Sequence, residues 1–543
     1  MLTAVISFVG FTATVAGISY WITRNDRMDS SEAYFLGGRN LTGWVIAGSL
    51  MLTNLSTEHL IGLNADAFNH TIAVMAWETT AALAMVLAAI YFLPRFLRLG
   101  LTTIPEFLAI RFDNQTRVIA SVLFLFSYAA AILPVVLLFG ATGIESLFDV
   151  TSTLGISETQ SKWLIVWGVG VLGSLYAIFG GLRAIAISDT INGIGFLVAG
   201  LMVPAFALYM IGDGNILAGF DTVYTEEHQK FDITGDEPGS FLPFGVLFTG
   251  MIINQIFFWC TNQSIIQRAL GARNLKEAQK GVLIAATFKL VGPIVIVLPG
   301  VIAYHMFKDS LTSDQYLQAY PLLVKTVLPT ALTGFFAAVM VGAVLSTFNS
   351  VLNSAATLFS EGIYKAIINR QSSGRNQVKV GRLCSILLAI AAMLIAPRID
   401  TTGSLYLYLQ QINATFFGPM LAVILCGLLT RRVPARAAKV ALIVGPIAFY
   451  LLNFSFASQF QHLMMRMFQL SEPLHFLHIL AIVFVLTLIL IAVLSYRTSV
   501  TDLGVGSEQS TSPVVDMTPW RWARLAAVLI SVATIGIYVF LAQ

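Results

Sequence analysis

Charged residues are scarce in this chain. Lys, Arg, Asp and Glu make up 11% of its 543 residues, whereas soluble domains carry roughly 25%. Because so few charges could not cover a water-exposed globule of this size, a soluble fold is excluded, and the 57% hydrophobic content excludes disorder as well. The formal net charge of +3 is too small to favour nucleic acid as a partner. A lipid bilayer is the remaining environment.

Cysteine is also rare. Cys260, Cys384 and Cys426 each lie in or beside an apolar run, so they provide no disulfide framework and no metal-ligand spacing. The seven histidines are not spaced as a nucleophile–base pair or a metal cluster. Glu58 stands next to His59, and this pair alone leaves a membrane enzyme as a minor alternative. We therefore expect a protein that is not an enzyme and needs no organic cofactor.

Long apolar runs are what the chain has in abundance. A helix that crosses a bilayer needs about 20 such residues. No Lys or Arg precedes Arg24, so the first run is expected to be a retained membrane helix and not a cleaved signal. Fourteen runs predict an all-α polytopic membrane protein with 14 transmembrane helices. They cover about residues 2–22, 44–68, 72–98, 116–148, 161–180, 184–212, 241–266, 277–307, 327–364, 378–397, 402–429, 437–454, 474–495 and 521–541.

The positions of Lys and Arg predict the orientation, because these residues concentrate in cytoplasmic loops. With the N-terminus outside, 24 of the 31 Lys and Arg residues fall in cytoplasmic loops, six fall on the other side, and Lys289 lies within a run. We therefore predict a multi-pass protein of the plasma (inner) membrane with both termini extracytoplasmic. The long outer loop 213–240 is acidic, and the inner loop 498–519 is rich in Ser and Thr and predicted to be flexible.

The second run crowds polar residues into its middle, reading SLMLTNLSTEHLIGLNADAF. Ser, Thr and Asn side chains offer the backbone alternative hydrogen-bond partners. We therefore expect this helix to unwind locally and to free carbonyl oxygens that can coordinate a cation. The alternative is a buried polar seam between helices.

Two later runs carry polar residues of different kinds. The ninth, VGAVLSTFNSVLNSAATLF, places Ser346 beside Thr347 and Ser350 one turn later. Neutral hydroxyls suit a hard cation such as Na⁺, and small-residue helix packing is the alternative.

The seventh run sets amides, Gln255 among them, beside aromatics such as Trp259. That combination is typical of a site for a neutral polyhydroxylated solute, with an interfacial belt as the alternative.

Three charged residues remain at membrane depth, where ionisable groups are costly and usually functional. Glu78 lies in the third run, far from an easy escape to water. Lys289, in the eighth run, could pair with a carboxylate, donate to solute hydroxyls, or extend toward the inner face. Asp189 opens the sixth run near the cytoplasm and is either a helix N-cap or a functional group.

Several sequence blocks occur in a fixed order between about residues 30 and 430. They are SEAYFLGGRNL, SLMLTNLSTEHLIG, LTTIPEFLAIRF, YAIFGGLRA, WCTNQSIIQRAL, EAQKGVLIAATFKL and STFNSVLNSAATLF. Together they resemble the solute–sodium symporter family, on its sodium–glucose (galactose) cotransporter branch.

This resemblance implies a leucine-transporter-type core of five plus five helices in two inverted repeats, with one extra helix before and three after. The implied parts are the first helix and cytoplasmic linker (1–43), the first repeat (44–212), the acidic outer loop (213–240), the second repeat (241–429) and three peripheral helices (430–543).

The resemblance also implies site residues. The family's sodium site maps onto the backbone carbonyls of Leu52, Leu55 and Ala343 and the hydroxyls of Ser346 and Thr347, with Asp189 on the inner sodium exit path. Solute contacts map onto Asn54, Glu78, Lys289 and either Gln410 or Gln411, and we assign Ser350 to the solute as well. Trp77 on the outer side, and Phe258 and Trp259 on the inner side, map onto gate positions.

Departures from the family concern the solute more than the ion. His59 stands where galactose carriers have a glutamine, and Gln255 stands where they have an asparagine. His59 could charge near neutral pH or act as a neutral hydrogen-bonding group. These changes put glucose and galactose in question and leave the sodium pathway intact.

The sequence therefore predicts a sodium-coupled secondary active symporter that imports a small polar solute by alternating access, with a hexose or related sugar favoured. A carboxylated solute (sialic acid, an amino acid or an organic anion) is the alternative, because Lys289 and His59 could bind it. Na⁺ is the expected coupling ion, with one complete set of ligands. A receptor would need a long cytosolic signalling domain, and a channel would show pore-lining repeats. The oligomeric state is left open.

Overall fold

A computed structural model describes residues 2–26, 28–235, 240–312, 315–399, 404–496 and 514–541. These residues form helices and no β-strand. Residues 236–239 of the acidic loop, and residues 498–513 of the loop predicted to be flexible, lie outside the described residues.

Twelve helical segments of the described chain are long and apolar enough to cross a membrane. They coincide with twelve of the fourteen predicted runs, and some consist of two helices stacked end to end. They are α1 (Leu2–Thr23), α5 (Ala76–Leu87) with α6 (Leu93–Arg98), α8 (Asn114–Ser127) with α9 (Leu133–Phe148), the two arms of α11 (Glu158–Ile211), α15 (Leu275–Ile296) with α16 (Leu298–Phe307), α18 (Thr330–Thr357) with η9 (Leu358–Ile368), α19 (Gly374–Ile395), α20 (Leu405–Leu429), α21 (Ala435–Tyr450), α23 (Phe476–Ser495) and α24 (Ala523–Leu541).

Shorter helices connect these segments. They are α2 (Ser31–Leu36), α7 (Ile104–Arg111), α10 (Val150–Leu154), α12 (Ile216–Glu226), η6 (His228–Phe231), α17 (Ala319–Val327) and α22 (Ala457–Phe468).

The two remaining runs, the second and the seventh, are broken helices. The second consists of α3 (Gly43–Asn54), a π-helical turn η2 (Glu58–Leu63) and α4 (Asn64–Asn69), and the seventh of α13 (Gly250–Cys260) and α14 (Gln263–Leu270). None of these pieces reaches the length that a bilayer requires. The total of fourteen crossings stays a prediction.

The break after α3 follows from local hydrogen bonding. Leu55 leaves the helical region at φ −78° and ψ 80°. The amide of Ser56 donates to the carbonyl of Asn54 (2.9 Å), and the amide of His59 donates to the carbonyl of Ser56 (3.0 Å). In an uninterrupted α-helix these two amides would bond to the carbonyls of Leu52 and Leu55. Both carbonyls are therefore released, and the predicted unwinding of this helix is confirmed.

A second change of direction separates the two arms of α11. Gly181 lies there at φ +61°, in the left-handed region that glycine adopts without strain. A Cβ at this position would also come within 3.2 Å of the Tyr34 carbonyl oxygen. The short gap predicted at 181–183 is therefore a turn that depends on glycine.

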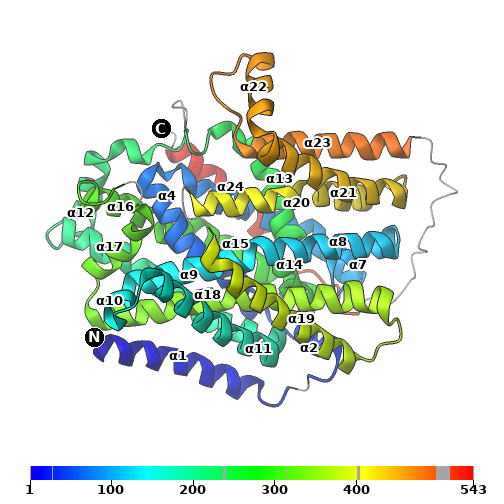
Figure 1. The fold of residues 1–543 in the computed structure, drawn as a ribbon, viewed down its shortest axis with the longest axis horizontal. Coiled ribbons are helices and arrows are strands. Elements are labelled where there is room, and N and C mark those ends of the chain that lie inside the picture. The colour runs from blue at the N-terminus through cyan, green and yellow to red at the C-terminus, as the bar shows by residue number, and fades with distance from the viewer. Residues whose placement is uncertain are drawn as a thin grey trace.

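The broken second helix lies at the centre of the packing. α3 packs against α11, α15 and α18, while α18 also packs against α1 and α9. α13 packs against α5 and α20. In Figure 1, α1 lies along one side of the molecule, and the C-terminal helices α21 and α23 lie along the opposite side. The start of α1 and the end of α24 lie toward the same end, where α10, α12, α16 and α17 are also found.

The loop after α12 holds the end of α4. Lys230 Nζ donates to the carbonyls of Phe68 (2.7 Å) and His70 (2.8 Å) and lies 3.8 Å from the centre of the Tyr304 ring. Burial lowers the pKa of Lys230 to about 8, although Glu227 opposes the shift. The cation takes up carbonyls that the helix end leaves without amide partners. This contact fixes α4, while packing against α11 and α15 fixes α3.

The orientation of the chain can be tested by labelling single cysteines in a variant whose three native cysteines are replaced. We expect a membrane-impermeant maleimide to label Asp213→Cys in intact cells, because that loop is predicted to be outside. Arg432→Cys should react only after permeabilisation. The reverse labelling pattern would show that the predicted orientation is wrong and that both termini face the cytoplasm.

Candidate functional site

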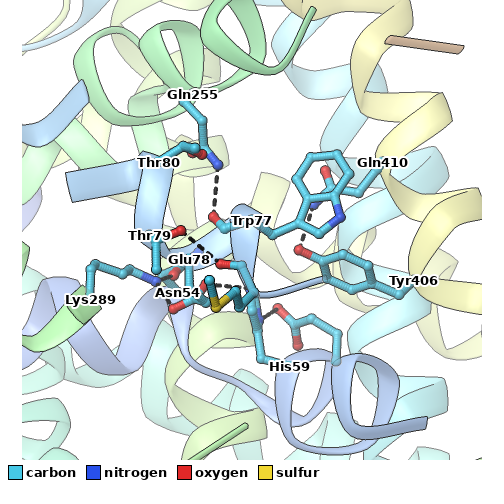
Figure 2. A network of polar contacts seen from close by, with 12 residues as sticks. Asn54, His59, Trp77, Glu78, Thr79, Thr80, Gln255, Lys289, Tyr406 and Gln410 are labelled. Carbon is cyan, nitrogen blue, oxygen red and sulfur yellow. Dashed lines mark hydrogen bonds and ion pairs between the residues drawn. The ribbon is translucent and has the colours of Figure 1, made fainter. Parts of the chain in front are cut away.

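A cavity lies beside the break in the second helix, between η2, α5, α13 and α20 (Figure 2). Its cavity volume is about 60 Å³. The predicted site residues that line it are Asn54, His59, Trp77, Glu78, Gln255, Phe258, Trp259, Thr347 and Gln410.

A buried ion pair lies beside this cavity, and only its carboxylate partner, Glu78, is part of the lining. Lys289 Nζ lies 2.6 Å from Glu78 Oε2 and also donates to the side-chain oxygen of Asn54. The side chains of Lys289 and Glu78 are each 2% exposed, and Figure 2 shows all three residues turned toward one another. Lys289 therefore does not extend to the membrane surface but is neutralised at depth by a carboxylate.

His59 lies between two carboxylates. Its Nε2 is 3.6 Å from Glu78 Oε1, and its Nδ1 is 3.7 Å from Glu58 Oε1. Glu58 Oε2 and His59 Nδ1 are buried and have no hydrogen-bond partner among the described residues. The group thus holds two carboxylates and one ammonium, and it offers unused polar atoms to a ligand.

Aromatic rings and amides complete the cavity wall. Gln255 Nε2 donates to the backbone carbonyl of Trp77 (2.7 Å), and Gln410 Nε2 donates to the Tyr406 hydroxyl (2.8 Å). The Tyr406 ring contacts those of His59 and Trp77 edge-on, at centroid distances of 5.5 and 5.9 Å. The wall therefore presents amide donors and acceptors next to ring surface, which is suited to a hydroxylated solute.

The predicted sodium ligands lie on α3, the break that follows it, and α18, and hydrogen bonds join the end of α3 to α18. Thr347 Oγ1 donates to the Thr53 carbonyl (2.8 Å), and Ser350 and Thr53 share a hydroxyl–hydroxyl bond of 3.1 Å. The Ser346 hydroxyl is buried and forms no hydrogen bond with a described residue. Together with the released carbonyls of Leu52 and Leu55, these oxygens have the chemistry that a hard monovalent cation requires. Ala343, one turn before Thr347 on α18, is fully buried.

Asp189 belongs to a neighbouring buried network. Its Oδ2 accepts a hydrogen bond from Ser49 Oγ (2.7 Å), which in turn accepts one from Arg268 Nε (3.1 Å). Arg268 also donates to the backbone carbonyl of Ser264. Asp189 lies close enough to Ser346 to interact with it. Asp189 is therefore not a simple N-cap, because it lies within a continuous arm of α11 and is held between helices.

Three predicted solute residues do not line the cavity: Lys289, Ser350 and Gln411. Ser350 is fully buried and bonded to Thr53, and Gln411 lies outside the lining although its neighbour Gln410 is part of it. Adjacent residues on a helix differ in direction by about 100°, so only one of the two glutamines can face the cavity. The sequence alone does not show which one. The structure places Gln410 toward the cavity.

Sequence reasoning missed Tyr406 and misplaced Arg268. Tyr406 gave no signal, because an aromatic residue in an apolar run is ordinary. Arg268 was counted with the cytoplasmic loop charges, but it is fully buried. The available signal was its segment, QSIIQRAL, in which Gln263, Gln267 and Arg268 recur at helical spacing and are all buried.

A family model for the sodium:solute symporter family matches residues 34–445. The chain belongs to this family. Its members and neighbours are symporters, so its role is transport and not enzymatic catalysis. The coupling ion of the family is Na⁺.

Two curated proteins are similar over most of this symporter. The uncharacterized symporter YidK of Escherichia coli is 42% identical over 540 residues, covering 99% of this chain and 91% of that protein. The sodium/glucose cotransporter of Vibrio parahaemolyticus is 31% identical over 526 residues, covering 91% and 90%.

A solved structure of a Na⁺-coupled sialic acid symporter, in a substrate-bound outward-open state, has a similar fold. It superposes with a TM-score of 0.76 at 19% identity, covering 92% of this chain and 98% of that one. The predicted all-α, leucine-transporter-type fold is thereby confirmed. The repeat boundaries at 44–212 and 241–429 stay a prediction.

The buried pair can be tested by a double-mutant cycle. Replacing one partner leaves the other charge buried and unpaired, which costs about 3–5 kcal/mol. We expect Glu78→Gln and Lys289→Gln each to lower the melting temperature in detergent clearly, and the double variant to lose less than their sum. Arg273→Gln, in a half-exposed pair with Glu277, is the control and should cost about 0–1 kcal/mol. Strict additivity of the two buried substitutions would show that the pair is not coupled.

Proposed function

We propose that this symporter imports a neutral polyhydroxylated solute, with a hexose or related sugar favoured, together with Na⁺. The observation that supports this most is the engagement of Lys289. Its ammonium is already bonded to Glu78 and Asn54, so it is not free to bind the carboxylate of a solute.

The charge balance of the cavity supports the same proposal. Glu58 and Glu78 line it, and Lys289 is the one ammonium bound to this group. With His59 neutral and Lys289 balanced by Glu78, the group leaves no uncompensated positive charge to attract an anionic solute in a medium of low dielectric constant. A neutral sugar instead presents hydroxyls that can donate to the carboxylates and accept from the amides of Asn54 and Gln255.

The carboxylated solute remains the second candidate because of two observations. The structural neighbour is described as a sialic acid symporter, and His59 would become cationic if it gained a proton. That neighbour is 19% identical and supports the fold alone. Binding an acid at this cavity would also require Lys289 to leave Glu78, or His59 to remain protonated, and each of these has a free-energy cost.

Sodium binding would act through the break in the second helix. An ion held by the carbonyls of Leu52 and Leu55 and the hydroxyls of Ser346 and Thr347 would join α3 to α18. Asn54 lies between those two carbonyls in the chain and turns its side chain to the cavity. Ordering the break therefore orders Asn54 for the solute, and the coupling must be reciprocal.

The free energy released when Na⁺ enters down its gradient is sufficient to accumulate the solute inside the cell. One Na⁺ moving down a potential of 100 mV releases about 2.3 kcal/mol, and a tenfold solute gradient costs about 1.4 kcal/mol.

Phe258 and Trp259 would close the inner side of the cavity until the two repeats move against each other.

The sodium site is tested with Ser346→Ala/Thr347→Ala. Losing two oxygen ligands should raise the Na⁺ concentration for half-maximal uptake by about tenfold or more, a change of about 1.4 kcal/mol. Ser354→Ala is the matched control, because Ser354 lies on the same helix and bonds to Gln267 (2.8 Å). Unchanged sodium dependence in the double variant would show that the site is assigned to the wrong residues.

The solute class is tested by competition in vesicles. Sodium-driven uptake of a labelled hexose is challenged with sugars, a cyclic polyol, sugar acids and amino acids, and we expect the neutral polyols to compete. Gln410→Ala should raise KM by about tenfold, as expected for a lost buried hydrogen bond of about 1–2 kcal/mol, whereas Gln411→Ala should change it by less than about twofold. A sugar acid or amino acid as the strongest competitor would overturn the neutral-solute proposal.

A further inference from the structure

A second recess lies far from the solute cavity, at the start of α24. Its wall includes Arg98 at the end of α6, Arg521 and Arg524 around the first turn of α24, and Trp520. Ile90 and Met517 contribute apolar surface. The charge distribution of the loops predicts that this end of the molecule faces the cytoplasm.

The segment before α24 is anchored, so the recess is a built feature of the fold. The amide of Trp520 donates to Gln279 Oε1 (2.9 Å), and Gln279 Nε2 donates to the Ala89 carbonyl (3.1 Å). Gln279 is 4% exposed. The amide of Leu275 donates to the Asp516 carbonyl (3.0 Å). These bonds hold residues 516–520 against α15 and fix the position of the recess.

The three arginines leave their charge uncompensated. Among the described residues, none of Arg98, Arg521 and Arg524 forms an ion pair, and Arg521 makes only a ring contact with Trp522 at 4.9 Å. Guanidinium groups present forked donors that match phosphate oxygens. A group of three such cations on one recess is therefore complementary to a phosphate-bearing anion.

We propose that this recess binds the headgroup of an anionic phospholipid of the cytoplasmic leaflet. Trp520 lies in it, and tryptophan is enriched at the level of lipid headgroups. Beyond the recess, α24 exposes Leu525, Val528 and Val532, each more than half exposed. A diester phosphate would contact the arginines while its acyl chains follow this apolar face, an arrangement that a free soluble anion could not use.

The test titrates full-length protein in detergent with phosphatidylglycerol and follows bound lipid by native mass spectrometry. Each arginine near an anionic headgroup contributes about a fivefold gain in affinity. We therefore expect Arg98→Gln/Arg521→Gln/Arg524→Gln to weaken binding by roughly 100-fold, and Arg524→Gln alone by about fivefold. The triple Arg→Lys variant should retain the part of the binding that depends on charge and lose the part that depends on the forked donors. Phosphatidylcholine should bind weakly to all of them.

Two controls separate this site from general attraction to positive charge. Arg370→Gln/Arg375→Gln/Lys379→Gln removes three exposed cations from another predicted cytoplasmic segment, and it should leave phosphatidylglycerol affinity unchanged. Inorganic phosphate should not displace the lipid. The proposal is overturned if the control triple weakens binding as much as the recess triple, if the recess triple binds normally, or if inorganic phosphate competes at equal concentration.

Discussion

The interruption of the second apolar helix after Asn54 determines the geometry of both proposed binding regions, for the ion and for the solute. A continuous helix would use every carbonyl of this segment internally, leaving none for an ion. Because Ser56 and His59 bond to nearer carbonyls, those of Leu52 and Leu55 are released from their usual partners in the helix. The same interruption turns Asn54 and His59 into the solute cavity. Ion and solute chemistry are therefore joined by only a few residues of backbone.

Such a break is tolerated only because protein surrounds it. α3 is held by α11, α15 and α18, and the outer piece α4 is held by Lys230 from the loop after α12. Each half of the helix is thus fixed by different partners. This arrangement allows the joint between them to be the mobile element when an ion enters or leaves.

Electrostatics inside the bilayer restrict what the cavity can accept. Buried charges are costly unless paired, and here Lys289 is paired with Glu78 while Glu58 lies beside them without a cation of its own. The solute that we propose, which brings hydroxyls and no negative charge, fits this composition. A second buried network runs from Arg268 through Ser49 of α3 to Asp189. Both networks contact α3 and keep their charges buried.

The sequence by itself determined the membrane environment, the positions of the apolar runs and the helix that breaks, because hydrophobic length and Ser, Thr and Asn density are local properties. Resemblance to a family supplied nine of the residues that line the cavity. Tertiary structure alone decided that Gln410 and not Gln411 faces the cavity, that Lys289 is paired with Glu78, and that Arg268 is buried. These outcomes depend on the rotation of each helix and on partners more than 200 residues away in the chain, which no local pattern encodes.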